Sequence, residues 1–286
     1  MRLFSRLLSV SALVVAPISY AHAQDAGKNL ALDFRTTVVV QGRPDTGVIT
    51  GHAVGTADKM RVDVKMIGSG AAVGMLASQG EVSMIVTDSG KTITYLDSKK
   101  GQYMRVQPAE MIAQAQQMGG MKMDFSGTEA KVDNLGAGPT ILGHPTSHYR
   151  IVTGMTMKIS AMGQEQTVKI GSTTDTYYAA DIKADLNPFA SLNGGDMANM
   201  FGTNSKEFAD KIKAAQAKLP KGTTLRAVSS STLSSAGETK ITNSQAEVTS
   251  IQWVAFDPKT FEVPSTYTAV PLPGMGGSAG GSIPPK

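Results

Sequence analysis

The chain contains no cysteine among its 286 residues. This absence excludes disulfides, thiol catalysis and a lipid anchor attached to a cysteine. A strong charge of one sign is also missing, because 27 basic side chains stand against 23 acidic ones. No run of lysine and arginine lies beside aromatic residues, as a groove for single-stranded nucleic acid requires. We therefore expect no nucleic-acid partner.

Long apolar segments are missing after the first residues of the chain. At the start, Arg2 and Arg6 precede the apolar residues 7–18, and Ala21-His22-Ala23 fits the small-x-small pattern of signal peptidase sites. This arrangement predicts a signal peptide over residues 1–23. A retained membrane anchor is the alternative, but the apolar segment is shorter than the ~20 residues of a spanning helix. We expect a protein that is periplasmic or secreted, soluble after cleavage and not membrane-spanning.

We predict one β-rich domain over residues 24–271 of the mature chain. Apolar and polar residues alternate through much of this sequence. This alternation is typical of half-buried strands. On one side of the first strand lie Leu30, Leu32, Phe34, Thr36, Val38 and Val40. The pattern predicts further strands near 60–66, 82–86, 93–95, 131–135, 147–152, 155–160, 166–170, 175–180, 223–231 and 239–256. Close turn signals between them predict an antiparallel arrangement. Residues 272–286 are rich in Gly, Pro and Ser and predict a disordered tail.

Two segments interrupt the strands with helical patterns, near residues 109–123 and 186–219. In the first, Met111, Ala115 and Met118 recur at helical spacing before Gly119-Gly120. In the second, we expect a helix over about 205–219, ended by Pro220 and Gly222. Its apolar face comprises Phe208, Ile212, Ala215 and Leu219. The expected fold is α+β: a curved antiparallel sheet or incomplete β-barrel with helices covering its concave face. A β-sandwich is the alternative.

Few residues are suited to catalysis. After signal removal the histidines are His52, His144 and His148, and Pro145 opposes a helix that would pair the last two on a metal. No Gly-x-Ser-x-Gly motif is present. The sequence therefore predicts no enzyme, metal or cofactor. An envelope hydrolase whose site is assembled from distant residues stays open as an alternative.

Methionine is the one residue type used unusually often, with fifteen in the mature chain. Flexible thioethers can fill an irregular core, or they can line an adaptable apolar groove beneath the helices. The second interpretation predicts a ligand-binding groove. Its candidate residues are Met104, Met111, Met118, Phe189, Met197, Met200, Phe208 and Ile212.

Several segments are similar to an uncharacterised family of exported bacterial proteins, known only as a domain of unknown function. They include Lys99-Lys100-Gly101-Gln102-Tyr103-Met104, His148-Tyr149-Arg150-Ile151 and the closing Phe261-Glu262-Val263-Pro264-Ser265-Thr266-Tyr267. That family resembles the periplasmic lipoprotein carriers and their outer-membrane receptors (Lol-type). The resemblance implies an incomplete antiparallel barrel with helices over an apolar cavity. Family members often carry a cysteine within the segment that here reads Gly143 to Tyr149, so any role of that cysteine is absent.

These observations lead to one main hypothesis. The protein is expected to be a non-enzymatic periplasmic binding protein for an apolar ligand, such as a lipid or an acylated protein. A structural or sensory envelope module that acts through contacts with a protein partner is a further alternative.

Overall fold

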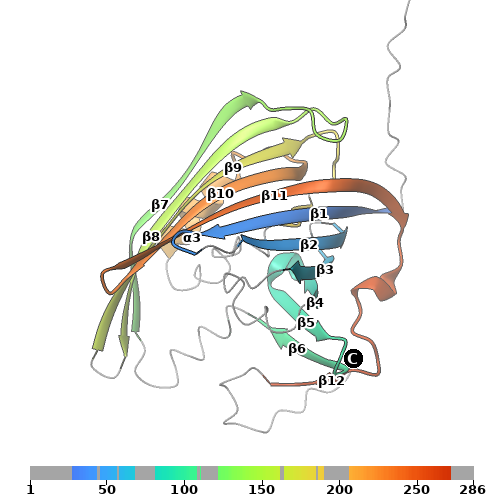
Figure 1. Ribbon diagram of the computed structural model, residues 1–286, viewed down its shortest axis with the longest axis horizontal. Helices are drawn as coiled ribbons and strands as arrows, with labels where there is room; N and C mark the ends of the chain where they lie inside the picture. Colours follow the sequence, from blue (N-terminus) through green and yellow to red (C-terminus); the bar gives the residue numbers. More distant parts are fainter. Residues whose placement is uncertain are drawn as a thin grey trace, which may run out of the picture.

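The computed structural model describes residues 28–43, 46–56, 58–67, 81–107, 110, 122–161, 164–184, 186–189 and 206–271. Within these ranges the chain forms a single twelve-stranded sheet in the order β12-β6-β5-β4-β3-β2-β1-β11-β10-β9-β8-β7. The strands are β1 (Lys28–Val40), β2 (Thr46–Gly55), β3 (Met60–Ile67), β4 (Glu81–Thr87), β5 (Thr92–Asp97), β6 (Gln102–Val106), β7 (Lys122–Ala137), β8 (Ser147–Ala161), β9 (Gln164–Ala179), β10 (Thr223–Ser235), β11 (Glu238–Ala255) and β12 (Thr268–Ala269). The sheet is strongly curved and is not closed into a barrel (Figure 1).

The strand order divides the sheet into two antiparallel meanders. Strands β1 to β6 follow one another in space as in sequence, and so do β7 to β11. One long seam joins the two meanders, in which β1 pairs with β11 from Lys28↔Ala255 to Val40↔Thr242. Consequently β6 and β7, which are consecutive in the chain, lie toward opposite edges of the sheet.

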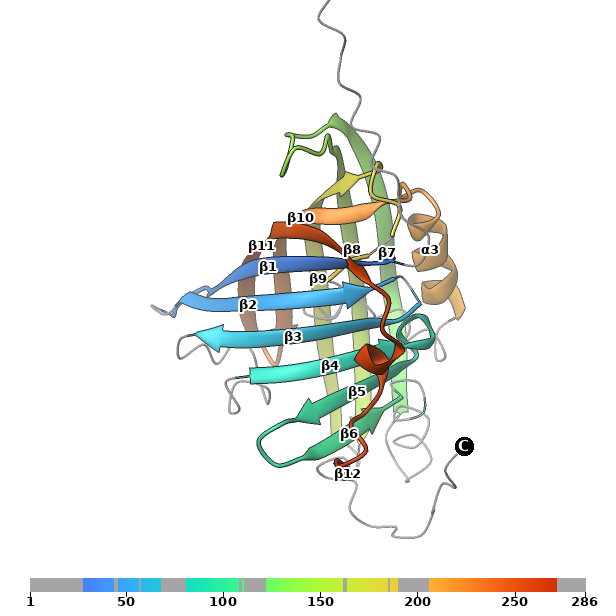
Figure 2. The ribbon, with the colours of Figure 1, turned by 90° about the vertical axis from the view of Figure 1, so that its right-hand side faces the viewer.

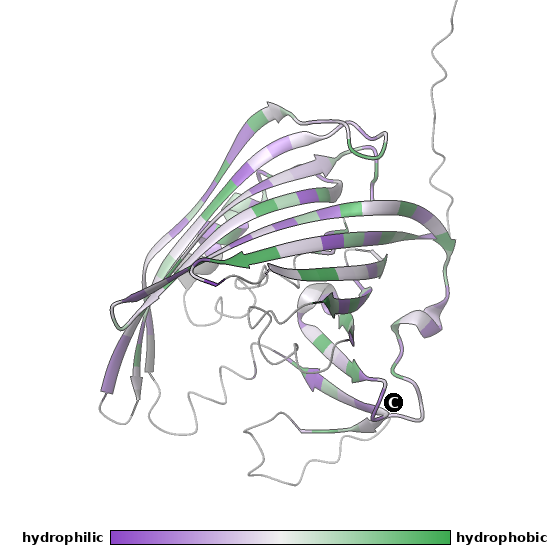
Figure 3. Cartoon of the chain, viewed as in Figure 1, coloured by the Kyte–Doolittle hydropathy of each residue, from purple (hydrophilic) through white to green (hydrophobic). Residues whose placement is uncertain are grey.

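Hydrophobic and hydrophilic residues alternate along many of the strands (Figure 3). Because successive side chains of a strand point to opposite faces, the sheet has two chemically different faces. We call the face that carries Phe34, Val62 and Met84 the inner face; it is the concave side in Figure 1. Its alternate residues in β1 to β4 form the main core together with Ile182 and Leu186 from the segment after β9. The predicted alternation of the first strands is thus confirmed, and it decides where the core lies.

Several strands are longer than the sequence suggested. The predicted strands 147–152 and 155–160 are parts of one continuous strand, β8. Likewise, the predicted strands 166–170 and 175–180 are parts of β9. Glycine is a poor strand former, but Gly154 lies opposite Gly171 inside the ladder. Because strands flank β8 and β9 on both sides, the ladder continues through residues that are poor strand formers in isolation.

The helix α3 (Lys206–Gln216) confirms the second predicted helix. It packs against β7, the edge strand, rather than spreading over the concave face. The Nζ atom of Lys211 donates to the carbonyl oxygen of Thr128, 2.9 Å away, beside an irregularity in β7. A helix packed against an edge strand is one way in which proteins protect an edge from pairing with another chain. Of the first predicted helical segment, residues 111–121 lie outside the described residues, and residues 122–123 already belong to β7.

The other edge is covered by the end of the chain. After β11 the chain crosses the outer face of β3 to β6 (Figure 2), forms the 3-10 helix η3 (Pro258–Phe261) and ends in β12. We call residues 256–270 the strap. Its β12 pairs in parallel with β6, and Thr268 N donates to Gly101 O over 2.9 Å. Phe256 stacks on Phe261, and the ammonium of Lys59 lies 4.8 Å from the Phe256 ring centre.

The fold is therefore mostly β: one curved, mixed but largely antiparallel sheet, with one short α-helix among the elements bounded within the described ranges. The expected curved sheet is confirmed, and the strands form one sheet instead of the two of a sandwich. Within the described ranges the expectation that helices cover the concave face can be followed for α3, which packs against the edge strand β7. None of the described helices is long and apolar enough to cross a bilayer.

Candidate functional site

Charge separates the two faces of the sheet. Among the described strand residues on the inner face, charged side chains occur only at strand ends and near hairpin turns: Lys28, Asp97, Glu238 and Lys240. Burial raises the pKa of Tyr178 to about 12, so that this inner-face phenol stays neutral. The remaining described strand charges lie on the outer face. A ligand on the middle of these strands' inner face would thus meet uncharged side chains, with charges only toward the strand ends and hairpin turns.

The part of the inner face formed by β1 to β4 is filled by the protein itself. Phe34 and Phe189 are each only 2% exposed, and their rings meet edge to face with centres 5.7 Å apart. Leu186 belongs to the same cluster. Phe189, which the sequence placed in a ligand groove, is therefore a core residue in this structure.

The part formed by β7 to β9 carries a second apolar surface. Met157 faces Phe125 on one side and Val168 on the other, and Ile170 faces Met155. None of these side chains belongs to the main core cluster. Most of them are half-buried, whereas Met155 is buried. We call the following residues the β7–β9 patch: Phe125, Ile151, Met155, Met157, Ile159, Val168 and Ile170.

The outer face of the same strands is polar. Thr156 and Lys158 alternate with Met157 along β8, and Thr167 and Lys169 alternate with Val168 along β9. The apolar character is therefore confined to the concave side. An amphipathic sheet of this kind needs a partner for its apolar face, either from the chain or from a ligand.

Between the main core and the β7–β9 patch lies a band of hydroxyl groups. The Oγ1 atom of Thr174 is 2.8 Å from Oγ of Ser229, and Ser231 donates to Ser172 over 3.2 Å. We call a central group of inner-face serines and threonines of β9 to β11 the hydroxyl band. Its members are Ser172, Thr174, Thr176, Ser229, Ser231, Thr242 and Ser244.

The structure brings few of the predicted site residues together. Met104 lies on the inner face of β6 opposite Tyr95 and is half-buried, and Ile212 is half-buried in α3. For Phe208 the structure describes the backbone position in α3. The four other predicted methionines, Met111, Met118, Met197 and Met200, lie outside the described residues. The sequence analysis missed the β7–β9 patch, although the alternation in residues 151–159 was the signal that could have revealed it.

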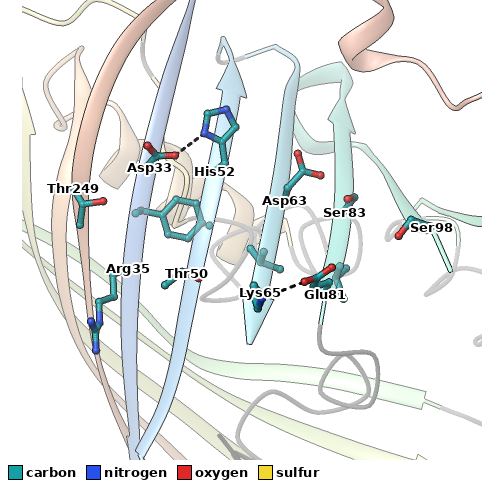
Figure 4. A pocket seen from close by; sticks show the side chains of 14 residues that line it. Asp33, Arg35, Thr50, His52, Asp63, Lys65, Glu81, Ser83, Ser98 and Thr249 are labelled. Carbon is teal, nitrogen blue, oxygen red and sulfur yellow. Dashed lines mark hydrogen bonds and ion pairs between the residues drawn. The ribbon is translucent and has the colours of Figure 1, made fainter. Parts of the chain in front are cut away.

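A groove of about 540 Å³, with many polar residues in its lining, opens on the outer face over β1 to β4 (Figure 4). His52 Nδ1 lies 2.7 Å from Asp33 Oδ1, and Lys65 forms an ion pair with Glu81 at 3.5 Å. If His52 acted as a general base for a serine nucleophile, the two side chains would have to lie within hydrogen-bonding distance. The groove's Ser83 lies two strands from His52 in the row Asp33↔His52↔Asp63↔Ser83, a separation of about 10 Å. Ser83 is therefore not a nucleophile paired with His52.

The other two histidines also meet carboxylates. His144 Nδ1 lies 2.7 Å from Asp181 Oδ2, and His148 Nε2 lies 3.3 Å from Asp175 Oδ1 while its ring stacks on Tyr177. His144 sits in a turn and His148 in β8, so the helical metal pair is not formed. In the part of the chain that the structure describes, no group of three metal-ligating side chains converges.

Asp175 links β9 to β8 on the outer face. Arg150 donates to both of its carboxylate oxygens, over 2.8 Å and 2.9 Å, and these hydrogen bonds lower the pKa of Asp175. Burial of the carboxyl opposes this shift without reversing it. The geometry is that of a bidentate brace between two strands.

This brace predicts how stability depends on pH. Because the folded-state pKa of Asp175 is lowered, its contribution is present above the unfolded-state pKa of about 3.9 and is lost as the pH falls through the folded-state value. Asp175→Asn should therefore show a shallower loss of stability on acidification below about pH 4. Urea unfolding across a pH series measures this slope. Asp124→Asn, at an exposed position on β7, is the control, and identical slopes for Asp175→Asn and the parent would contradict the assignment.

Comparisons with known proteins add one structural similarity. No protein-family model matches the chain, and no curated protein matches it. The chain is similar to the crystal structure of a "putative outer membrane lipoprotein-sorting protein domain" from Vibrio parahaemolyticus, with 7% sequence identity and a TM-score of 0.29. The alignment covers 83% of this chain and 91% of that one. Membership in the uncharacterised exported family stays a prediction from the sequence.

Proposed function

We propose that the protein is a non-enzymatic binding protein of the bacterial envelope that holds an acyl chain, of a lipid or an acylated protein, against its inner face. The observation that carries this proposal is the β7–β9 patch. It is apolar, concave, uncharged and separate from the main core. The envelope location in this proposal rests on the signal peptide predicted for residues 1–23, which lie outside the described ranges.

The energetics of such binding are adequate. Burying an acyl chain gains about 0.8 kcal/mol per methylene, so roughly ten methylenes contribute on the order of 8 kcal/mol before entropic costs. That corresponds to about micromolar affinity or weaker. No covalent step and no charged group is needed, and the residues of the β7–β9 patch are all uncharged. Met155 and Met157 give the patch side chains that adapt to different chain shapes.

The test is uptake of a fluorescent fatty-acyl probe by the purified mature protein, with mass spectrometry of lipids extracted from it. Met157→Asp places a carboxylate in the centre of the β7–β9 patch and should weaken probe binding about tenfold or more. Thr156→Asp, the next residue on the same strand but on the outer face, is the matched control and should bind normally.

Circular dichroism on both variants separates loss of binding from loss of fold. A protein that is free of extracted lipid and takes up no probe would exclude the proposed function. Equal losses in the two folded variants would place the ligand somewhere other than on the inner face.

A further inference from the structure

The hydroxyl band lies where the head of a bound acyl chain would reach. Thr174 is the cross-strand neighbour of Ile151, a residue of the β7–β9 patch. Thr174 also touches Ser229 on β10, and Ser229 lies opposite Ser244 on β11. A chain lying along the β7–β9 patch therefore meets hydroxyl groups before it meets the main core.

These hydroxyls have hydrogen-bonding capacity left over. When two hydroxyls pair, one proton lies between the two oxygens and the accepting group keeps its own proton to donate elsewhere. The pairs Thr174–Ser229 and Ser231–Ser172 thus each have one further donor. A carbonyl oxygen is the natural acceptor for such a donor.

Compensation for a negative charge is scarce around the Thr174–Ser229 end of the hydroxyl band. The inner-face cation on these strands is Lys240, an exposed residue near the β10–β11 hairpin turn, four residues along β11 from Ser244, which faces Ser229. Two other cations on these strands point to the outer face and are engaged there, since Arg150 binds Asp175 and Arg226 binds Glu247 in two hydrogen bonds each. A carboxylate placed on the hydroxyl band would lose water without gaining a cation, which is unfavourable.

We propose that the inner face selects its acyl ligand by the charge of the head group, accepting an uncharged ester or amide carbonyl on the hydroxyl band and disfavouring an anionic head there. This inference rests on the proposed function and adds the chemical class of the ligand. It favours glycerol esters and N-acylated or ester-acylated polypeptides over free fatty acids.

The experiment compares two ligands that differ only at the head. A monoacylglycerol and the free fatty acid of the same chain length, both as monomers, displace a neutral hydrophobic probe from the full mature protein. Above the pKa of the fatty acid, the ester should bind at least about tenfold more tightly. Below that pKa the acid is uncharged, and the difference should largely disappear.

Variants of the band provide the second arm. The double change Thr174→Val with Ser229→Ala should weaken binding of the ester several-fold and leave binding of the anionic acid nearly unchanged. Thr173→Val with Ser230→Ala changes the neighbouring residues on the outer face of the same strands, and it should alter neither affinity.

The outcomes distinguish this inference from the function on which it rests. Equal binding of ester and anion, or tighter binding of the anion, would overturn the head-group selectivity while the proposed function stands. Failure of every ligand and probe to bind would overturn the proposed function itself. If the double variant does not fold, the pH dependence of fatty-acid binding by the parent protein still tests the head-group selectivity.

Discussion

Phe34→Ala is expected to lower the free energy of unfolding by about 3–5 kcal/mol, as truncation of a buried aromatic side chain does in other cores. The Phe34 ring is almost fully buried, meets Phe189 edge to face and lies directly over Gly51 of β2. Its loss would leave a cavity at the centre of the main core, which the rigid sheet cannot fill by collapsing. Urea or thermal unfolding followed by circular dichroism measures the change.

Gly51 makes this prediction sharper. A Cβ atom added at Gly51 would overlap the Phe34 ring, and the ring cannot retreat because Phe189 packs against it. Gly51→Ala alone should therefore cost roughly 1–3 kcal/mol through overpacking. In the Phe34→Ala background, Gly51→Ala should change the free energy of unfolding little, because the ring that the new Cβ would overlap has been removed.

The coupling between the two positions is the quantity to measure. Gly171→Ala is the control, since a Cβ there meets nothing within 4 Å. It should be close to neutral in both backgrounds. Additive effects of Gly51→Ala and Phe34→Ala would show that the ring does not occupy the space above Gly51.

Removing the strap is the second change with a large expected effect. Ile85 and Leu96 are 2% and 5% exposed, yet they lie on the outer face and outside the main core cluster. The strap passes over this part of the sheet (Figure 2), and we infer that it buries these two side chains. Exposing both side chains would cost roughly 3–6 kcal/mol, at about 1.5–3 kcal/mol each.

A chain that ends at Ala255 should accordingly unfold at clearly lower denaturant concentration, and the freed edge of β6 should promote association. A chain that ends at Pro271 keeps the strap and lacks only the Gly-, Pro- and Ser-rich tail, so it should match the full protein. Chemical unfolding measures the stability of each truncation, and size-exclusion chromatography measures its association. Equal stability of both truncations would mean that something other than the strap buries Ile85 and Leu96.

The local pattern of the sequence was sufficient to predict many of the strands and the side on which the first of them buries its residues, but it missed β2 and β6 and the first part of β7. Alternation in residues 30–40 placed Leu32 and Phe34 on the core side, as the structure has them. The pairing of β1 with β11 could not be predicted in the same way. The two strands are about two hundred residues apart, and their register depends on contacts that no local pattern contains.

The β7–β9 patch was not among the predicted site residues. Methionine content pointed to the helical segments, whereas the described apolar surface outside the core consists mostly of branched and aromatic residues on β7 to β9, such as Ile151 and Phe125. Sequence alternation shows that a strand has an apolar side. Whether that side faces the main core or a separate surface depends on the curvature of the whole sheet, which only the structure reveals.

The seam between β1 and β11 also constrains how the chain reaches its native state. The first meander includes β1, but the strand that covers the open edge of β1 is the last long strand of the sequence. During synthesis or translocation from the N-terminus, β1 emerges first. Its second neighbouring strand, β11, can pair with it only after residues 242–255 have emerged. Closing so long a loop slows folding and favours an all-or-none final step. A chain organised in this way stays incompletely folded until nearly all of it has emerged.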